Sequence, residues 1–228
     1  MRGLNLGGVV EFCRVLTCQP QLLLPQLSLG AVPNASILTH LYIAFWSTHA
    51  SDMTEVPFQK LRDRGFRGVI FDKDNTLTIP HEIAIPSHFA SSLDECRRVF
   101  GDSGVVVFSN SAGSVDDKDG NQATKIEEEL HVAVLRHKHK KPGGITCVQK
   151  HFEKLNPQTL VIIGDRYSTD VLFGNLNGLL TIRTEQFLPE SESFVNWQLQ
   201  RIEKAAVRML ISAGVKPPTH PLWDNIEA

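Results

Sequence analysis

The chain has 228 residues, a formal net charge of −2 and a hydrophobic share of 42%. This length suits one domain of ordinary enzyme size with a sizeable apolar core. The nearly balanced charge gives no electrostatic reason to expect nucleic acid as a partner, so we predict none. The four cysteines are scattered, without a CxxC pair. This pattern is typical of free thiols in a reducing compartment rather than of a disulfide framework or a zinc site.

The N-terminal part of the chain is poor in charge. From Val15 to Ser51 there is no Asp, Glu, Lys or Arg, although charged residues make up 21% of the chain. The apolar run Ile37–Trp46 is shorter than the ~20 residues that a membrane-spanning helix needs. Two interpretations stay open: a layer packed on the core, or a peripheral membrane contact through Leu22–Leu24 and Phe45–Trp46. We therefore divide the chain into an apolar, potentially membrane-associating segment, 1–56, and a catalytic domain, 57–228.

Short apolar runs alternate with helical patterns after residue 57. The runs that predict strands buried on both faces are Gly68–Phe71, Val105–Phe108, Val132–Leu135, Leu160–Ile163 and Leu179–Ile182. The helical patterns lie at His88–Phe100, Gln122–Leu130, Gly144–Leu155, Asp170–Asn175 and Phe194–Ser212. The alternation predicts a Rossmann-like α/β fold, with a parallel sheet and helices on both of its faces. In the last helix, one side carries Phe194, Trp197, Ile202, Ala205 and Met209.

Polar residues follow four consecutive predicted strands. In chain order they are Asp72 and Asp74, then Ser109 and Asn110, then a basic loop ending at Lys141, then Asp165 and Asp170. The right-handed crossover rule brings the carboxyl ends of parallel strands to one edge of the sheet, where ligands bind. Phosphoryl transfer needs a nucleophile, hard oxygen ligands for magnesium and donors for the phosphate oxygens. The set therefore predicts a phosphoryl-transfer site.

In this order, four motifs resemble the signature motifs of the haloacid dehalogenase superfamily over about residues 65–182. They are Asp72-x-Asp74-x-Thr76, Ser109, Lys141 and Gly164-Asp165-(x4)-Asp170. The resemblance implies that Asp72 is the nucleophile that forms an aspartyl-phosphate. It also implies that Asp74 protonates the leaving oxygen and then activates water. Ser109 and Asn110 would bind the phosphoryl group, and Lys141 would neutralise charge on that group and on Asp72.

The resemblance also implies a Mg²⁺ cofactor. Its ligands would be Asp72, Asp165 and Asp74, the last through its backbone carbonyl. Asp170 would support either the metal site or Lys141, and Thr76 is a further supporting residue. These assignments agree with the charge balance, since three neighbouring carboxylates need cations between them.

A finer resemblance is to the mitochondrial phosphatidylglycerophosphatase family. It rests on Phe71-Asp72-Lys73-Asp74-Asn75, Phe108–Gly113, Arg136-His137-(x3)-Lys141-Pro142 and Gly164-Asp165-Arg166-(x2)-Thr169-Asp170. Members of the family remove the terminal phosphate from phosphatidylglycerophosphate, giving phosphatidylglycerol for cardiolipin synthesis at the inner mitochondrial membrane. The resemblance implies a phospholipid substrate and a mitochondrial location, peripheral on the matrix side of the inner membrane. Leu29–Thr54 is longer than the family's usual link into the first strand.

Several alternatives remain at this stage. The gaps from Asp74 to Ser109 and from Ser109 to Lys141 are too short for a separate cap domain, which favours an open site. An open site also suits a soluble phosphate ester or a phosphoprotein. A third hypothesis is a catalytically silent, membrane-associated scaffold. Arg166 could form an ion pair with Asp170 or bind a headgroup. Lys138 and Lys140 could be a solvated face or attract anionic lipid.

Overall fold

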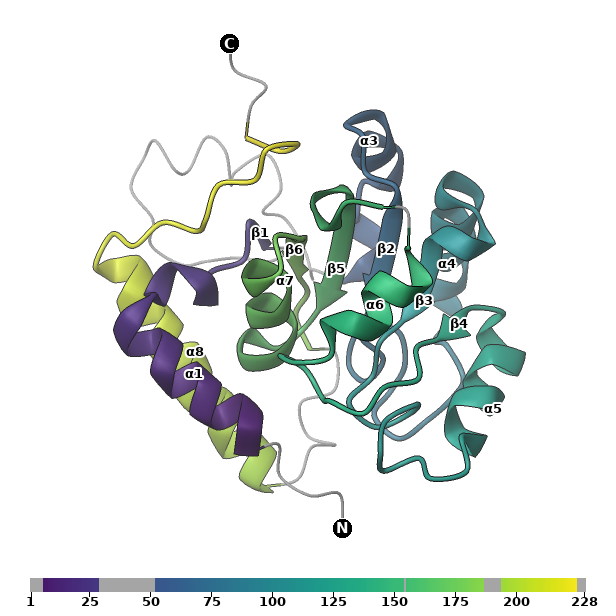
Figure 1. Ribbon diagram of the computed structural model, residues 1–228, viewed down its shortest axis with the longest axis horizontal. Helices are drawn as coiled ribbons and strands as arrows, with labels where there is room; N and C mark the ends of the chain where they lie inside the picture. The colour runs from purple at the N-terminus through teal and green to yellow at the C-terminus, as the bar shows by residue number, and fades with distance from the viewer. Residues whose placement is uncertain (1–5, 29–51, 154, 187–193, 225–228) are drawn as a thin grey trace.

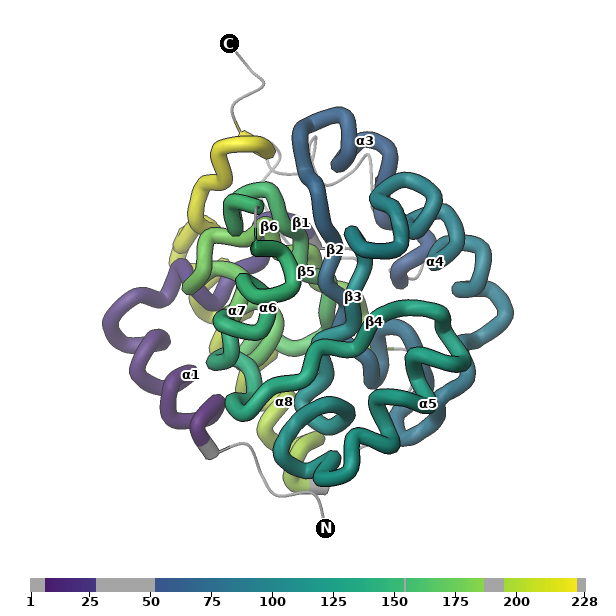
Figure 2. Tube along the Cα trace, turned by 45° about the vertical axis from the view of Figure 1, so that its right-hand side comes forward, coloured from purple at the N-terminus to yellow at the C-terminus, as the bar shows by residue number. Residues whose placement is uncertain are grey.

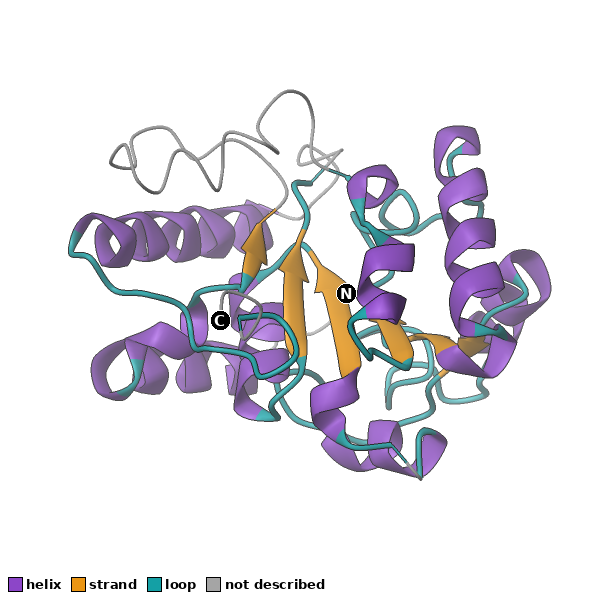
Figure 3. Ribbon diagram, turned by 90° about the horizontal axis from the view of Figure 1, so that it is seen from above, coloured by secondary structure: helices purple, strands orange, loops and turns teal. Residues whose placement is uncertain are grey.

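A six-stranded, fully parallel sheet forms the centre of the computed structural model, which describes residues 6–28, 52–153, 155–186 and 194–224. In spatial order its strands are β1 (Leu27–Ser28), β6 (Leu180–Arg183), β5 (Leu160–Gly164), β2 (Gly68–Phe71), β3 (Val105–Val107) and β4 (Ala133–Val134). Every pair of neighbouring strands is parallel, and the central strands can be followed side by side in Figure 3. The predicted Rossmann-like α/β fold is confirmed, and each of the five predicted strands is present within one or two residues of its expected ends.

Helices cover both faces of this sheet (Figures 1 and 2). They are α1 (Leu6–Cys18), α3 (Phe58–Asp63), α4 (Ser87–Phe100), α5 (Asn121–Leu130), α6 (Ile145–His151), α7 (Leu172–Leu176) and α8 (Phe194–Ser212). Neighbouring residues of a strand point to opposite faces. Val69 and Phe71 accordingly pack in the cluster that contains α3, α4 and α5, whereas Ile70 packs in the one that contains α6 and α7. Continuous apolar strands suit a sheet covered in this way.

The described part of the N-terminal segment packs on protein. Residues 20–23 form a short 3-10 helix, and β1 adds an edge strand beside β6. Leu23 and Leu24 are buried with Phe12 of α1 and Val207 of α8. The predicted membrane contact through Leu22–Leu24 is therefore wrong for Leu23 and Leu24, because their apolar surface is covered by protein, whereas Leu22 is only partly buried. The other half of that hypothesis, Phe45–Trp46 within the run Ile37–Trp46, lies outside the described residues.

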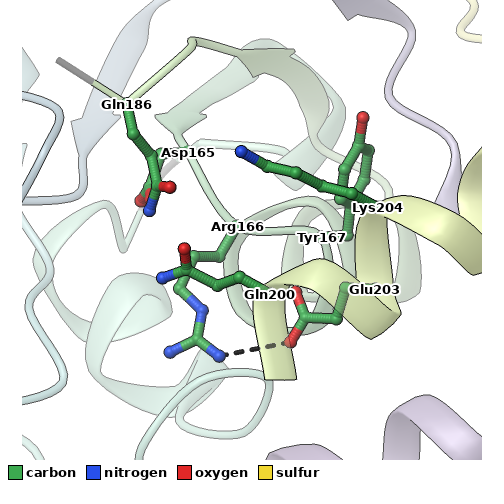
Figure 4. A pocket seen from close by; sticks show the side chains of 7 residues that line it. All are labelled: Asp165, Arg166, Tyr167, Gln186, Gln200, Glu203 and Lys204. Atoms are coloured by element: carbon green, nitrogen blue, oxygen red, sulfur yellow. Dashed lines mark hydrogen bonds and ion pairs between the residues drawn. The ribbon is translucent and has the colours of Figure 1, made fainter. Parts of the chain in front are cut away.

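Helix α8 has the predicted bounds, but a different side of it is buried. Val207 is buried against α1. The polar residues Gln200 and Glu203 are buried as well, and each is only 5% exposed. Ile202 and Met209, which we placed on a common apolar side, are 61% and 73% exposed. The inward face includes polar side chains because the helix lies against the polar turn that follows β5 (Figure 4). There Glu203 accepts a hydrogen bond from the Ser168 hydroxyl at 2.6 Å.

The predicted absence of a cap domain is confirmed at both points of the chain where one could be inserted. Residues 75–140 are all described, and between Asp74 and Ser109 they form only α4 and one short 3-10 helix (Asp102–Gly104) besides strand β3. Between Ser109 and Lys141 they form only α5 and β4. No cap domain is inserted at either point. No helix in the described ranges is long and apolar enough to cross a bilayer.

Candidate active site

Strands β2 and β5 lie side by side at the centre of the sheet, and their carboxyl ends carry Asp72 and Asp165. The chain proceeds from β2 outward to β3 and β4 on one side, and from β5 outward to β6 on the other. Ligands of open α/β sheets bind at such a switch in strand order. The topology therefore brings together two carboxylates that are 93 positions apart in the sequence.

Lys141 lies between two of the predicted carboxylates. Its Nζ donates a hydrogen bond to Asp72 Oδ1 at 2.7 Å and another to Asp170 Oδ1. The lysine is fully buried, and Asp170 is 2% exposed. Burial alone lowers the pKa of Lys141, but the charges of Asp170 and Asp72 outweigh it and the pKa is raised, so the ammonium form is maintained.

The carboxyl groups of Asp72, Asp165 and Asp170 form a cluster in which one oxygen from each lies within 4.8 Å of the others. Hard oxygen donors at this spacing fit Mg²⁺, which prefers carboxylate and water ligands. Asp72 and Asp165 are two of the three predicted ligands. The Asp74 side chain is not in the cluster. Its predicted contribution is the backbone carbonyl, which stays a prediction.

The local backbone makes this approach possible. A π-helical turn, Tyr167–Val171, follows β5 and carries Asp170 back toward the strand end. A Cβ atom at Gly164 would lie 2.4 Å from Asp170 Cγ, so only glycine fits there. The Asp170 carboxylate is held by the backbone N–H of Arg166 at 3.2 Å and by the Thr169 hydroxyl at 3.1 Å. The glycine of the Gly-Asp-(x4)-Asp motif is therefore required because the second aspartate of the motif packs directly against it.

The closeness of these buried carboxylates raises the pKa values of two of them. Burial, together with the charges of Asp170 and Asp74, raises the pKa of Asp72 to about 7, although Lys141 opposes the shift. Burial and the charges of Asp72 and Asp170 raise the pKa of Asp165 well above its ordinary value. Lys141 alone therefore does not compensate the cluster, and a divalent cation would supply the missing positive charge.

Asp74 lies apart from this cluster, at the start of the loop after β2. Its carboxylate accepts a hydrogen bond from Lys73 Nζ at 2.5 Å and one from the His81 backbone N–H at 3.1 Å. The Ser111 hydroxyl donates to the other oxygen at 3.5 Å. The side chain retains 23% exposure. Asp74 is thus fixed beside the cluster, with access to solvent for proton exchange.

The loops after β3 and β4 are joined around Ser109 and Asn110. Asn110 Oδ1 accepts a hydrogen bond from the Lys141 backbone N–H at 2.7 Å, which links the second motif to the third. Ser109 Oγ lies 3.0 Å from Ser111 Oγ and accepts from the Ser111 backbone N–H at 3.1 Å. A ring nitrogen of His137 lies 2.8 Å from the Ser109 carbonyl oxygen. Both predicted phosphate-binding residues therefore lie in the same loop assembly as Lys141.

Two of the remaining predicted residues differ from expectation in their contacts. Thr76 is buried, and its hydroxyl has no hydrogen-bond partner within the part of the chain that the structure describes. The proposed Arg166–Asp170 ion pair is wrong, since the Arg166 guanidinium pairs with Glu203 at 3.2 Å and only its backbone contacts Asp170. Lys140 is paired with Asp116 at 2.6 Å.

Sequence reasoning missed several residues that surround the site. Lys73 and Ser111 both contact Asp74, and Gln186 Nε2 donates to Asp165 Oδ2 at 2.6 Å. Lys73 and Ser111 lie inside motifs that we had already singled out. Gln186 and Glu203 follow no strand that carries a motif, so no spacing pointed to them.

The family of this chain is decided by comparison with known proteins. The family model described as Mitochondrial PGP phosphatase, where PGP is phosphatidylglycerophosphate, matches residues 6–187. The chain belongs to this family. The predicted resemblance to it is thereby confirmed.

Curated relatives carry consistent names. Phosphatidylglycerophosphate phosphatase 1, chloroplastic/mitochondrial, of Arabidopsis thaliana is 36% identical over 98% of this chain and 58% of its own length. The chloroplastic protein of the same name from Chlamydomonas reinhardtii is 39% identical over 76% of this chain and 64% of its own length. A probable mitochondrial phosphatidylglycerophosphatase of Schizosaccharomyces pombe is 25% identical over 77% of this chain and 79% of its own length. The chain spans about six-tenths of the length of the first two relatives.

The raised pKa of Asp72 makes a prediction about stability. Between pH 3.8, its ordinary pKa, and about 7, the folded state holds a proton that the unfolded state has released. Stability contributed by this group therefore falls as pH rises through that window. In EDTA, we expect Asp72→Asn to gain free energy of unfolding relative to wild type between pH 4 and 7, measured by urea denaturation. Added Mg²⁺ should reduce the gain.

The matched control is Asp94→Asn on the exposed surface of α4, where the side chain is 74% exposed. Its difference from wild type should stay constant with pH. If the difference in free energy of unfolding between Asp72→Asn and wild type is equally independent of pH, the pKa of Asp72 is not raised by neighbouring carboxylates as stated here.

Proposed function

We propose that this chain is a Mg²⁺-dependent phosphatase that converts phosphatidylglycerophosphate to phosphatidylglycerol through an aspartyl-phosphate. The observation that carries the chemistry is Lys141, buried between Asp72 and Asp170 and beside Asp165 at the switch point of the sheet. A phosphate ester bound there would meet a nucleophile, a fixed cation and carboxylates suited to magnesium. The substrate is supported by membership of the family and by the names of the relatives.

The proposed reaction has two displacements at phosphorus. In the first, a carboxylate oxygen of Asp72 bonds to phosphorus while the bond from phosphorus to the glycerol oxygen breaks. The leaving oxygen takes its proton from Asp74. In the second, water gives a proton to Asp74 as its oxygen attacks phosphorus, and the bond to Asp72 breaks to release inorganic phosphate.

The fixed contacts of the site match these roles. Lys141 would balance charge on Asp72 and on the phosphate oxygens without moving, because Asp170 and Asn110 hold its two ends. Asp74, held by Lys73 and a backbone N–H, would stay deprotonated between the two steps, having given its proton to the leaving oxygen and not yet taken one from water. When bound by Asp72 and Asp165, Mg²⁺ would supply charge neutralisation for the phosphate oxygens.

We further propose that the protein works peripherally on the matrix side of the inner mitochondrial membrane. Val195, Ile202 and Met209 recur every seventh residue of α8 and are exposed, so they form one apolar stripe. Arg201 and Arg208 are exposed beside them on the same helix. An apolar stripe next to cations suits an anionic bilayer surface. Mitochondrial location is supported by the family's description and by the names of two of the relatives compared above.

Phosphate release from a defined panel tests the reaction and the substrate together. With Mg²⁺, the purified chain should release phosphate from phosphatidylglycerophosphate in detergent micelles, and EDTA should stop it. Asp72→Asn should lower the rate by at least about 10³-fold, because the nucleophile is lost. The Asp94→Asn control should keep wild-type activity.

The panel also contains soluble phosphate monoesters and a phosphopeptide at equal concentration. Preferential release from these would overturn the lipid substrate. Activity retained in Asp72→Asn would overturn the nucleophile assignment. Release from no compound at all would favour the scaffold hypothesis.

The membrane proposal has a separate test. The double substitution Ile202→Glu, Met209→Glu should reduce co-sedimentation with vesicles containing phosphatidylglycerol by at least about fivefold, since each change places a carboxylate in the apolar stripe. Activity on a soluble, deacylated headgroup should not change. Leu176→Glu, at the end of α7 away from the catalytic edge, is the control and should bind vesicles normally. Unchanged binding of the double variant would exclude this stripe as the contact.

A further inference from the structure

Lys73 is a second buried cation at the catalytic edge, and it lies between the two carboxylates of the first motif in the sequence. It is 5% exposed, and its ammonium group donates a hydrogen bond to Asp74 Oδ1 at 2.5 Å. Taking a charged pair out of water is costly, so such a pair is weak evidence for a role in stability. The place of Lys73, directly beside the carboxylate proposed to move protons, points to a role in the reaction.

The backbone of Lys73 is fixed by a tight turn. Its carbonyl oxygen accepts hydrogen bonds from the backbone N–H groups of Leu77 at 2.9 Å and of Thr78 at 3.0 Å. Asn75 has a left-handed backbone, with a φ of 63°, and its N–H donates to the Thr78 carbonyl oxygen at 2.9 Å. The lysine is therefore held at its backbone by this turn and at its ammonium group by Asp74.

A second donor holds the same oxygen of Asp74. The His81 backbone N–H donates to Oδ1 at 3.1 Å. His81 has a φ of 71°, in the left-handed region that residues other than glycine seldom adopt. The other carboxylate oxygen, Oδ2, accepts a longer hydrogen bond from the Ser111 hydroxyl at 3.5 Å. Two donors on Oδ1 restrict rotation of the carboxyl group, so Oδ2 keeps a constant position.

We propose that Lys73 is a positioning residue for both proton transfers of the reaction. With the His81 N–H it holds Oδ1 of Asp74, so that Oδ2 gives its proton to the leaving oxygen in the first step and takes one from water in the second. Lys141 acts elsewhere, on Asp72. The inference rests on the proposed function and deepens it: Lys73 enables the site to cleave esters of aliphatic alcohols such as glycerol, whose oxygen leaves readily only when it is protonated.

Two esters separate protonation of the leaving oxygen from the other steps. The glycerol oxygen of phosphatidylglycerophosphate needs a proton, whereas para-nitrophenyl phosphate releases a stable anion that needs none. The ratio kcat/KM reports the steps up to formation of the aspartyl-phosphate. Lys73→Met, which keeps the length of the side chain, should lower kcat/KM for the lipid by at least about 30-fold, since a misplaced general acid loses most of its effect. For the nitrophenyl ester, kcat/KM should stay within about threefold of wild type.

The same variant should lower kcat on the nitrophenyl ester, because attack of water on the aspartyl-phosphate also uses Asp74. Loss of kcat with kcat/KM maintained is a result that a purely structural role would not produce. Lys125→Met, at an exposed lysine of α5, is the matched control and should behave as wild type on both esters.

A double-mutant cycle tests whether Lys73 acts through Asp74. Lys73→Met combined with Asp74→Asn should have a kcat/KM for the lipid within about twofold of that of Asp74→Asn alone, since residues that act as a unit are not additive. Urea denaturation shows whether each variant folds. If Lys73→Met does not fold, Lys73→Gln takes its place; it keeps an N–H donor and should show a smaller loss with the same selectivity for the lipid.

Equal losses of kcat/KM on the two esters, additive losses in the double variant, or an unchanged kcat/KM for the lipid would overturn the role of Lys73 alone. Wild-type protein that releases no phosphate from phosphatidylglycerophosphate would overturn the proposed function and, with it, this inference.

Discussion

The ammonium group of Lys141 lies between Asp72 and Asp170 in a buried part of the sheet edge. Burying charges is costly, and a buried pair remains only where geometry and further hydrogen bonds compensate. Here the compensation comes from three different strand ends. Asp72 follows β2, Lys141 lies in the loop after β4, and Asp170 is carried by the turn after β5. The order of the strands in the sheet therefore decides which charged side chains meet at the site.

The same arrangement supports the proposal that the site binds a metal ion. One lysine faces a cluster of three carboxylates, and the pKa values of Asp72 and Asp165 are raised as a result. A divalent cation would restore the ionised form of Asp72, the form that attacks phosphorus in the proposed reaction. Crowding of like charges therefore destabilises the carboxylate cluster and would favour the binding of a cation there.

Much of this architecture follows from local sequence. Runs such as Val69–Phe71 predict buried strands, and the polar residues directly after them, Asp72 and Asp165, are placed together by the rules of parallel sheets. Contacts that depend on packing between distant elements could not be predicted in this way. The edge strand β1 has only two residues, and its pairing with β6 leaves no periodic pattern.

Helix α8 shows the same limit for the site. Its hydrophobic pattern favours Ile202 and Met209 as the buried side, yet Gln200 and Glu203 face inward because Arg166 and Ser168 provide polar partners there. The helical periodicity of a sequence shows where its apolar residues lie, but it does not show which polar groups of another element will pack against the helix. The contacts of Glu203 with Arg166 and Ser168 therefore could be found only in the three-dimensional structure.

The central claim is that Asp72 becomes phosphorylated during turnover. It is tested most directly by mass spectrometry of the wild-type protein, rapidly quenched in acid during turnover with Mg²⁺ and phosphatidylglycerophosphate. A phosphoryl group should be found on the peptide that contains Asp72, because the first proposed step leaves it there. A phosphoryl group on another residue, or release of product with no modified peptide at any time point, would contradict the account.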